Sequence, residues 1–367
     1  MTTMPPWAPG RPIAVNSAAS PRAERMIALW LFACCAMIFM MVLIGGATRL
    51  TESGLSITEW QPIAGAIPPL SDAEWTREFE RYQTIPQYQA IHAGMTLGEF
   101  KTIFLWEYVH RLWGRLIGMV FLGPFLWFLW RRSISRSLAP KLAAIFLLGG
   151  LQGALGWYMV QSGLQDRIEV SQYRLAAHLA AALLIYLWTL WVALGQLTPA
   201  GSIPSVVPAR LRHALGAVLV LALITMLAGA FVAGLRGGLV YNTFPLMNGY
   251  LVAPDYAQLS PWYLNPFENP VAAQFDHRVL AELVWLAVWA LWLYARRLGL
   301  APTLGRALNA VLLIANLQVA LGIATLLLVV PISLALLHQA GALLLLTALL
   351  VAWHRAQRLA PIASPAV

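Results

Sequence analysis

The sequence has few charged residues and almost no cysteine. Only 11% of its 367 residues are charged, whereas an ordinary soluble domain carries about 25%. A soluble fold of this length could not cover its surface with so few charges, which argues against a soluble enzyme. The net charge of +9 does not indicate a nucleic-acid partner, because basic residues would then have to cluster on one water-facing surface.

The two cysteines, Cys34 and Cys35, are adjacent and lie in the middle of an apolar run. Neighbouring cysteines cannot form an ordinary disulfide with each other, and two thiols alone do not make a zinc site. We interpret them as small packing residues. The segments between the apolar runs contain no cysteine, so no disulfide is expected to hold them.

Apolar residues are abundant, at 60% of the chain, and tryptophan occurs 16 times. A helix that crosses a bilayer needs about 20 mostly apolar residues. The runs are too long and continuous for the alternating strands of a membrane β-barrel. We therefore predict an all-α integral membrane protein with eight spans, at residues 26–47, 108–130, 140–161, 173–196, 212–234, 275–295, 305–328 and 332–353.

The basic residues are distributed unequally between the two sides of these spans. The side that carries both termini has one acid, Glu24, and fourteen basic residues: Arg11, Arg22, Arg25, Arg131, Arg132, Arg136, Lys141, Arg210, Arg212, Arg296, Arg297, Arg306, Arg355 and Arg358. The other side carries seven basic residues and most of the acids. The positive-inside rule then predicts that both termini lie on the cytoplasmic, or matrix-like, side. Residues 11–25 weakly resemble an organellar transit peptide, but a bacterial cytoplasmic tail is the more economical interpretation, so we expect a bacterial inner-membrane protein. The long outer segment 51–106 is expected to form short amphipathic helices.

The chain reads as two copies of a four-helix unit. Residues 107–111, Glu-Tyr-Val-His-Arg, match residues 274–278, Gln-Phe-Asp-His-Arg, and residues 151–156 match residues 317–322. A weaker match pairs Gly45-Gly46-Ala47 with Ala228-Gly229-Ala230. An even number of spans per copy gives both copies the same orientation. We predict two parallel pseudo-symmetric four-helix bundles, divided into a tail (1–25), a first half (26–196), a linker (197–211), a second half (212–354) and a tail (355–367).

Four of the seven histidines recur in this repeat at similar depth, near the outer face: His110, His178, His277 and His338. Ionisable residues inside a membrane are costly and usually functional. Two neutral imidazoles that face each other in a helical bundle can ligate a haem iron axially. Zinc or copper would require further close ligands, which the sequence does not offer at suitable spacing.

The residues near these histidines suggest how haem could be accommodated. Gly45, Gly46, Gly149, Gly150, Gly153 and Gly156 would allow close approach of a flat macrocycle, although small residues also serve plain helix packing. Arg111, Arg115 and Arg278 lie near the outer boundary, where they could pair with propionates or reach toward lipid phosphates. Glu107 corresponds to the neutral Gln274, which suggests one chemical site and one electron-transfer site. The alternative is that Glu107 only forms an ion pair with Arg111 or Arg115.

Several long strings in the chain are similar to those of haem A synthases. They are residues 45–56 with Trp60-Gln61-Pro62, residues 107–111, Asp276-His277-Arg278, and the loop 238–247. The resemblance covers residues 26–354 and is closest to the proteobacterial and mitochondrial members without an outer cysteine pair. One departure is Arg236, at a position where relatives often carry an acid.

The resemblance implies oxidation of the C8 methyl group of haem O to the formyl group of haem A, by two successive hydroxylations, for cytochrome oxidase assembly. It implies that His110 and His178, with Arg111 and Arg115, flank the substrate haem. It further implies that His277 and His338, with Arg278, hold a haem b, and that Glu107 is the catalytic acid, as general base or electrostatic stabiliser.

The resemblance also implies a set of partners. A quinone is the expected electron acceptor, and haem O synthase and cytochrome oxidase assembly factors are possible partners. The alternative function is a diheme b-type electron carrier, which would not need Glu107. A transporter is a third class, but it would require more polar residues in the middle of the spans than this sequence has.

Overall fold

The computed structural model describes residues 20–61, 64–165, 167–197 and 207–358. The predicted tails and linker therefore lie largely outside the described residues. Eight long apolar helices confirm the eight predicted spans. They are α1 (Pro21–Leu50), α3 (Leu97–Trp130), α4 (Ala139–Gln165), α5 (Gln172–Leu197), α6 (Ala209–Gly234), α8 (Pro270–Arg296), α9 (Pro302–Leu327) and α10 (Ile332–Arg358). The described part contains no β-strand, only an isolated bridge between Met247 and Tyr250.

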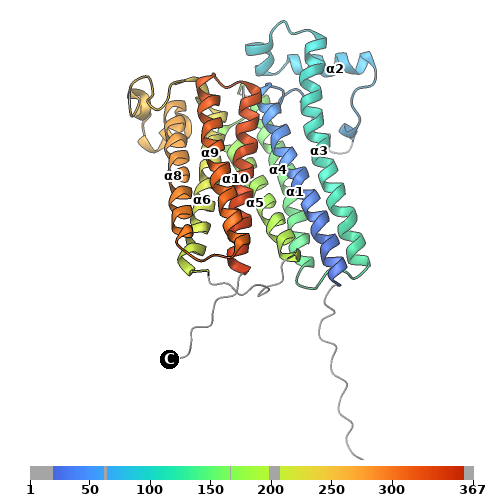
Figure 1. Cartoon of the computed structure of the whole chain (residues 1–367). Coiled ribbons are helices and arrows are strands. Elements are labelled where there is room, and N and C mark those ends of the chain that lie inside the picture. The colour runs from blue at the N-terminus through green and yellow to red at the C-terminus, as the bar shows by residue number, and fades with distance from the viewer. Residues whose placement is uncertain (1–19, 62–63, 166, 198–206, 359–367) are drawn as a thin grey trace, which may run out of the picture.

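Local sequence signals set where several helices begin. The Ser20 side chain caps α1 and Pro21 follows it, while Asn269 caps α8 ahead of Pro270. Proline suits the first helical position, because its missing N–H would have no partner there. Thr96 and Glu99 form a reciprocal capping box, so α3 begins eleven residues before the predicted span at 108. The upper part of α3 consequently stands above the other helices (Figure 1).

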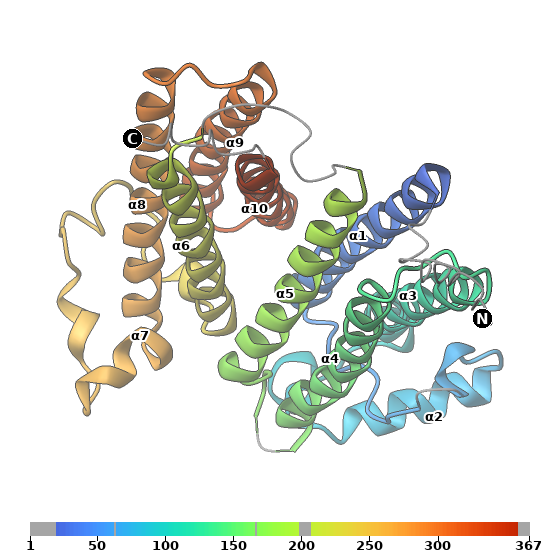
Figure 2. The ribbon, with the colours of Figure 1, turned by 90° about the horizontal axis from the view of Figure 1, so that it is seen from below.

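The helices form two groups, which Figure 2 shows from below: α1, α3, α4 and α5 on one side, and α6, α8, α9 and α10 on the other. In the first group α1 packs on α3 and α5, and α4 packs on α3 and α5. In the second group α6 packs on α8 and α10, and α9 packs on α8 and α10. The groups meet where α5 contacts α6 and α10, and where α1 contacts α10.

Two polar contacts join the groups inside the apolar interface. The Tyr186 hydroxyl of α5 lies 2.7 Å from Thr347 Oγ1 of α10. The Gln339 side chain of α10 donates to the backbone oxygen of Val42 in α1, at 3.1 Å. Buried hydrogen bonds of this kind specify which helix faces meet, since no hydrophobic force discriminates between apolar surfaces in lipid.

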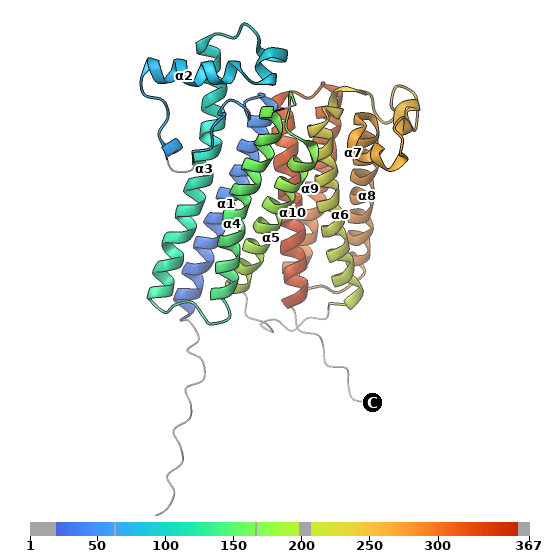
Figure 3. The same ribbon diagram turned by 180° about the vertical axis from the view of Figure 1, so that it is seen from behind.

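The outer side carries short elements. Helix α2 (Asp72–Gln83) confirms the prediction of a short amphipathic helix in the segment 51–106. It lies across the top of the first group, above the ends of the other helices (Figure 3). The segment between α6 and α8 contains η3 (Gly237–Leu239), η4 (Pro254–Ala257), η5 (Trp262–Leu264) and α7 (Asn265–Glu268). The start of α1 and the end of α10 lie on the opposite side (Figure 1).

Candidate functional site

The second half brings His277 of α8 and His338 of α10 together. Their ring centroids are 6.4 Å apart, with the ring planes at 88°. His277 Nδ1 lies 3.0 Å from the backbone oxygen of Thr225 in α6. A carbonyl oxygen can only accept, so Nδ1 carries the proton and Nε2 keeps a lone pair for a metal. A metal–nitrogen bond is about 2 Å long, and a ring nitrogen lies about 1 Å from the centre of its ring. Two such bonds to one metal atom would separate the ring centres by about 6 Å, which is compatible with the observed 6.4 Å.

The Gln318 side chain of α9 holds His338 from the other side. Its Nε2 lies 3.1 Å from His338 Nδ1 and donates to the backbone oxygen of His338 at 2.9 Å. Gly341 of α10 permits this position, because a Cβ there would lie 2.2 Å from Gln318 Oε1. Both Nδ1 atoms of the second half thus have a polar neighbour, but only the Thr225 oxygen is an acceptor. The Gln318 N–H can only donate, so this contact leaves the proton of His338 on Nε2. Turning the Gln318 amide, whose Oε1 has no hydrogen-bond partner within the described part of the chain, lets Oε1 accept from Nδ1 and frees Nε2 for a metal.

The first half places His110 on α3 and His178 on α5, two helices that both pack on α1 and α4. Gln152 of α4 donates to the backbone oxygen of His178 at 2.8 Å, as Gln318 does to His338. However, His178 Nδ1 is buried and has no hydrogen-bond partner among the described residues. The first pair is thus held less completely than the second.

Each of the four imidazoles packs against a glycine of a neighbouring helix. The distance from a Cβ built on the glycine to the nearest ring atom is 3.2 Å for Gly45 and His110, 3.0 Å for Gly156 and His178, 3.1 Å for Gly229 and His277, and 2.9 Å for Gly322 and His338. A larger residue would push the ring away, because real Cβ atoms rarely approach so closely. These glycines therefore set where the imidazoles lie.

The predicted glycines have different roles in the structure. Gly45 and Gly156 contact histidines, whereas Gly46 makes room for Gln339, whose Oε1 lies 1.9 Å from a built Cβ. Gly149, Gly150 and Gly153 have no neighbouring atom within 4 Å of a built Cβ. The weaker sequence match aligns Gly46 with Gly229. In the structure Gly45 is the residue that contacts a histidine as Gly229 does, so the alignment of these two strings changes by one residue.

Glu107 is buried on α3 and accepts four hydrogen bonds. Oε2 accepts from the Ser56 hydroxyl and the Ile57 backbone N–H, both at 2.8 Å. Oε1 accepts from the Arg111 guanidinium through Nε at 3.0 Å and Nη2 at 2.7 Å. The ion pair with Arg111, one of the two alternatives from the sequence, is present. It fastens the loop after α1 to the helix that carries His110.

The second half repeats this arrangement without the carboxylate. Gln274 Nε2 donates to the backbone oxygens of Gly237 and Tyr241, at 2.8 and 3.1 Å, and Gln274 Oε1 accepts from Arg278 at 3.1 Å. Arg278 also donates to the backbone oxygens of Tyr241 and Thr243. All of these hydrogen-bond partners of Arg278 are neutral, so its positive charge is available to an anion.

Arg111 and Arg115 border a cavity of about 540 Å³ beside α3 on the outer side. Its other charged residues are Glu59, Glu74, Arg77, Glu78 and Arg81. Arg115 donates to the backbone oxygen of Gln61 at 3.0 Å. The cavity thus combines four arginines and three glutamates with apolar side chains. Within the described residues, no group of three or more His, Cys, Asp or Glu side chains is placed to hold a metal ion.

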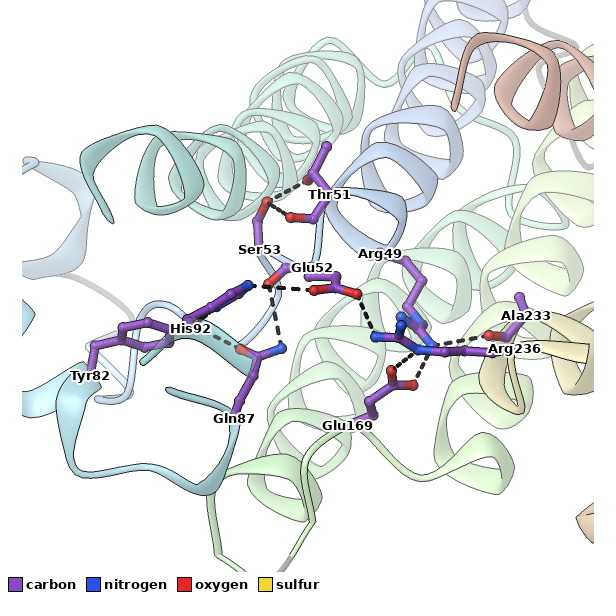
Figure 4. Close-up of polar contacts among 10 residues, drawn as sticks. All are labelled: Arg49, Thr51, Glu52, Ser53, Tyr82, Gln87, His92, Glu169, Ala233 and Arg236. Carbon is purple, nitrogen blue, oxygen red and sulfur yellow. Dashed lines mark hydrogen bonds and ion pairs between the residues drawn. The ribbon is translucent and has the colours of Figure 1, made fainter. Parts of the chain in front are cut away.

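Sequence reasoning left the role of Arg236 open, and the structure explains it. Arg236 follows α6 and forms ion pairs with Glu52, which follows α1, and with Glu169, which lies between α4 and α5 (Figure 4). Glu169 also pairs with Arg49 at 2.5 Å, and Arg49 donates to the backbone oxygen of Ala233 at 3.0 Å. This ion-pair network ties the outer ends of the two groups of helices. Glu169 had no signal in the sequence, because its partners Arg49 and Arg236 are 120 and 67 residues away.

The network continues toward α2. His92 Nε2 lies 3.4 Å from Glu52, and His92 Nδ1 lies 2.5 Å from the Tyr82 hydroxyl (Figure 4). Tyr82 is fully buried, and burial raises the pKa of its hydroxyl, which stays protonated. The outer layer above the first histidine pair is therefore joined to the ion-pair network.

Known proteins match almost the whole chain. Residues 28–350 match the COX15-CtaA family, described as cytochrome oxidase assembly protein. The haem A synthase of Nitrosospira multiformis is 51% identical over 338 residues, covering 91% of this chain and 94% of that protein. The haem A synthase of Rhodospirillum centenum is 55% identical over 337 residues, covering 92% and 88%.

Proposed function

The chain belongs to the COX15-CtaA family of cytochrome oxidase assembly proteins, and from this premise we propose how its two histidine pairs share one oxidation. It is a haem A synthase, a multi-pass membrane oxidoreductase that converts haem O to haem A. Converting a methyl group to a formyl group removes four electrons, so the protein must bind the substrate and also pass electrons on. Two sites of different character suit this division.

We propose that His277 and His338 hold a resident haem b. Three observations support this: the ring separation of 6.4 Å, the Thr225 oxygen that accepts from His277 Nδ1, and the two glycines against the rings. A preorganised pair suits a permanently bound group. When bound, this group would accept electrons from the substrate site. Arg278, one residue beyond His277, would pair with a propionate of haem b.

The first pair, His110 and His178, would flank the substrate haem O. An incompletely held pair suits a ligand that must enter and leave, and the unpartnered Nδ1 of His178 carries this part of the proposal. Arg111 and Arg115 lie one and five residues beyond His110 on α3, and both border the outer cavity. They would receive the propionates of haem O.

Glu107 would act as a fixed negative charge near the substrate methyl. Its four hydrogen bonds occupy both oxygens, which favours electrostatic stabilisation over proton abstraction, the other role open to it. A carboxylate held in a buried position can stabilise positive charge that develops as water attacks an oxidised methyl. Gln274 at the equivalent position cannot do this, in keeping with an electron-transfer role for the second site.

The remaining proposals concern topology and partners. We propose two parallel pseudo-symmetric halves, 26–196 and 212–354, because the helix neighbours in one group recur in the other. Tails at 1–25 and 355–367 and a linker at 197–211 would be cytoplasmic, and the haem sites would face the periplasm, as the loop charges predict. A quinone would be the final acceptor. Haem O synthase and cytochrome oxidase assembly factors would be the protein partners.

The test is to reconstitute the purified protein in lipid nanodiscs with haem O and to identify the haems by extraction and mass analysis. The expected result is one retained haem B per chain and conversion of haem O to haem A. Two haem B molecules per chain, with no conversion, would instead support the diheme electron carrier. A purified protein without any bound haem would support neither the proposed haem b site nor the diheme electron carrier.

A further inference from the structure

The outer segment between α6 and α8 has an unusual composition for a loop outside a membrane. Residues 237–267, called here the outer apolar segment, contain one charged residue, Asp255. The whole interval between α6 and α8, residues 235–269, contains three charged residues, because Arg236 and Glu268 flank this segment. The corresponding interval of the first half, residues 51–96, contains eight. The Asp255 carboxylate accepts from the Tyr241 hydroxyl at 3.2 Å and from Gln258 at 2.9 Å. The segment therefore presents almost no charge to its surroundings.

The same segment exposes large apolar side chains. Leu251 is 77% exposed and Trp262 is 78% exposed. The other exposed members are Leu239, Val240, Phe244, Leu246, Tyr250, Val252, Tyr263 and Phe267. A cluster of this kind in water would be unfavourable, and it marks a surface that contacts either a partner or a membrane.

The position of the segment identifies the membrane as its partner. In Figures 1 and 3 the segment extends sideways beyond α7 and α8 at the level of the outer helix ends, whereas α2 lies above that level. Helix α8, which follows the segment, also exposes Leu283, Leu286 and Leu293. Tryptophan and tyrosine concentrate where hydrocarbon meets headgroups, because their rings are apolar and their N–H or O–H groups are polar. A water-soluble partner would lie above the helices, not beside them.

The outer apolar segment is also fastened to the turn that carries His277. The Tyr256 hydroxyl donates to Asp276 at 3.0 Å, and the Tyr241 backbone oxygen accepts from Arg278 at 2.7 Å. These two contacts bracket His277 on α8. A force that holds the segment at a fixed depth therefore acts directly on the turn that presents this imidazole.

We propose that the outer apolar segment is an interfacial anchor: Leu251, Trp262 and Tyr263 insert into the outer leaflet, and the lipid surface fixes the depth and orientation of the α8 turn at His277. Apolar burial supplies the attachment, with no requirement for anionic lipid, because the segment offers no basic side chain. The link to a bound haem rests on the proposed function, whereas insertion into lipid does not.

Lipid insertion can be tested by site-directed fluorescence. In a Cys34→Ala, Cys35→Ala background, Leu251→Cys and Trp262→Cys would each be labelled with an environment-sensitive fluorophore in nanodiscs of phosphatidylcholine. The matched control is Thr76→Cys, exposed on α2. Brominated phosphatidylcholine is expected to quench the first two probes at least two-fold and to leave the control unchanged. Equal, weak quenching at all three positions would overturn the proposal. So would a Leu251 probe that lies in water in nanodiscs but is shielded in native membranes, since that result indicates a protein partner.

The positioning role needs a separate readout. The double variant Leu251→Asp, Trp262→Asp is expected to shift the electron paramagnetic resonance g-values of the resident haem, which report imidazole orientation, and to increase haem dissociation several-fold. Thr76→Asp should change neither. Insertion of this variant is read from a third probe, at Tyr263→Cys. Unchanged g-values despite lost quenching of that probe would overturn the link to His277 while leaving the anchor. Because the fluorescence test needs no bound haem, failure of the proposed function would remain distinguishable from failure of the anchor.

Discussion

Glu52 and Arg236 occupy equivalent positions in the two halves and pair with each other. Each lies seven residues after the glycine that contacts a histidine, Gly45 or Gly229, and each adopts a left-handed backbone conformation, with φ of 55° and 52°. Equivalent residues that meet between two repeats would repel if they carried the same charge. Here they carry opposite charges, so a conformation that costs about 1 kcal/mol in each residue places an attractive pair between the halves.

Replacing Arg236 is expected to weaken the junction between the halves. Arg236→Ala removes two partly exposed ion pairs and should lower stability by about 1 kcal/mol. Arg236→Glu should lower the stability further, because the new carboxylate would lie beside those of Glu52 and Glu169 and be repelled by both. Thermal unfolding in detergent at low and high salt measures this, with Arg77→Glu on α2 as control. An effect of Arg236→Glu that does not diminish in high salt would contradict the electrostatic explanation.

The two histidine pairs are expected to differ in what their loss does. His277→Ala or His338→Ala should abolish retention of the proposed haem b, because one of the two imidazoles that would hold its iron is lost. His110→Ala or His178→Ala should leave haem B bound but reduce haem A formation at least 100-fold. Pyridine haemochrome analysis and product analysis on the same samples separate these outcomes. Equal loss of haem B in all four variants would contradict the division between the sites.

Glu107→Gln makes the first site chemically like the second. A glutamine can still accept from Ser56 and Ile57, but it loses the charge that pairs with Arg111. We expect haem A formation to fall about 100-fold, the lower end of the effect of removing one electrostatic stabiliser, with haem B retained. The control is Glu99→Gln on the same helix, where glutamine can preserve the capping box. Turnover at the normal rate in Glu107→Gln would refute the proposed role of the charge.

Gly322→Ala should disturb the second pair through sterics alone. The added methyl group would lie 2.9 Å from His338 Cε1, so the ring must move. Gly305→Ala on the same helix has no atom within 4 Å of a built Cβ and should instead gain up to about 1 kcal/mol from helix propensity. Optical and paramagnetic resonance spectra of the resident haem compare the two variants. Identical spectra would show that Gly322 does not set the ring position.

The start of α2 is expected to loosen in acid. Hydrogen bonds from the backbone N–H groups of Leu70 and Ser71 hold the pKa of Glu74 below its usual range. A lowered folded-state pKa means that this stabilisation is present above the unfolded pKa and is lost as pH falls through the folded one. Hydrogen exchange at these two amides, corrected for intrinsic rates, should therefore become faster relative to neutral pH. Glu74→Gln should weaken this pH dependence, whereas Glu80→Gln should retain it.

Much of the fold follows from local sequence. The eight spans were predictable because an apolar run of about 20 residues in lipid can satisfy its backbone only as a helix. Hydropathy alone does not locate the early start of α3 at Leu97, which the Thr96–Glu99 capping box sets. The repeat identified the four histidines and the contrast of Glu107 with Gln274, since both depend only on residue type and order.

The sequence by itself determined the membrane helices, the recurrence of the histidines and the scarcity of charge. Only the tertiary structure decided which glycine contacts which imidazole, that Glu107 pairs with Arg111 and the loop after α1, and that Arg236 joins Glu52 to Glu169. The physical reason is that helix formation in lipid depends on neighbouring residues, whereas these contacts join side chains on different helices and loops. How the helices pack decides which side chains meet. Neighbouring residues can therefore have different partners: Gly45 contacts His110, whereas Gly46 contacts Gln339.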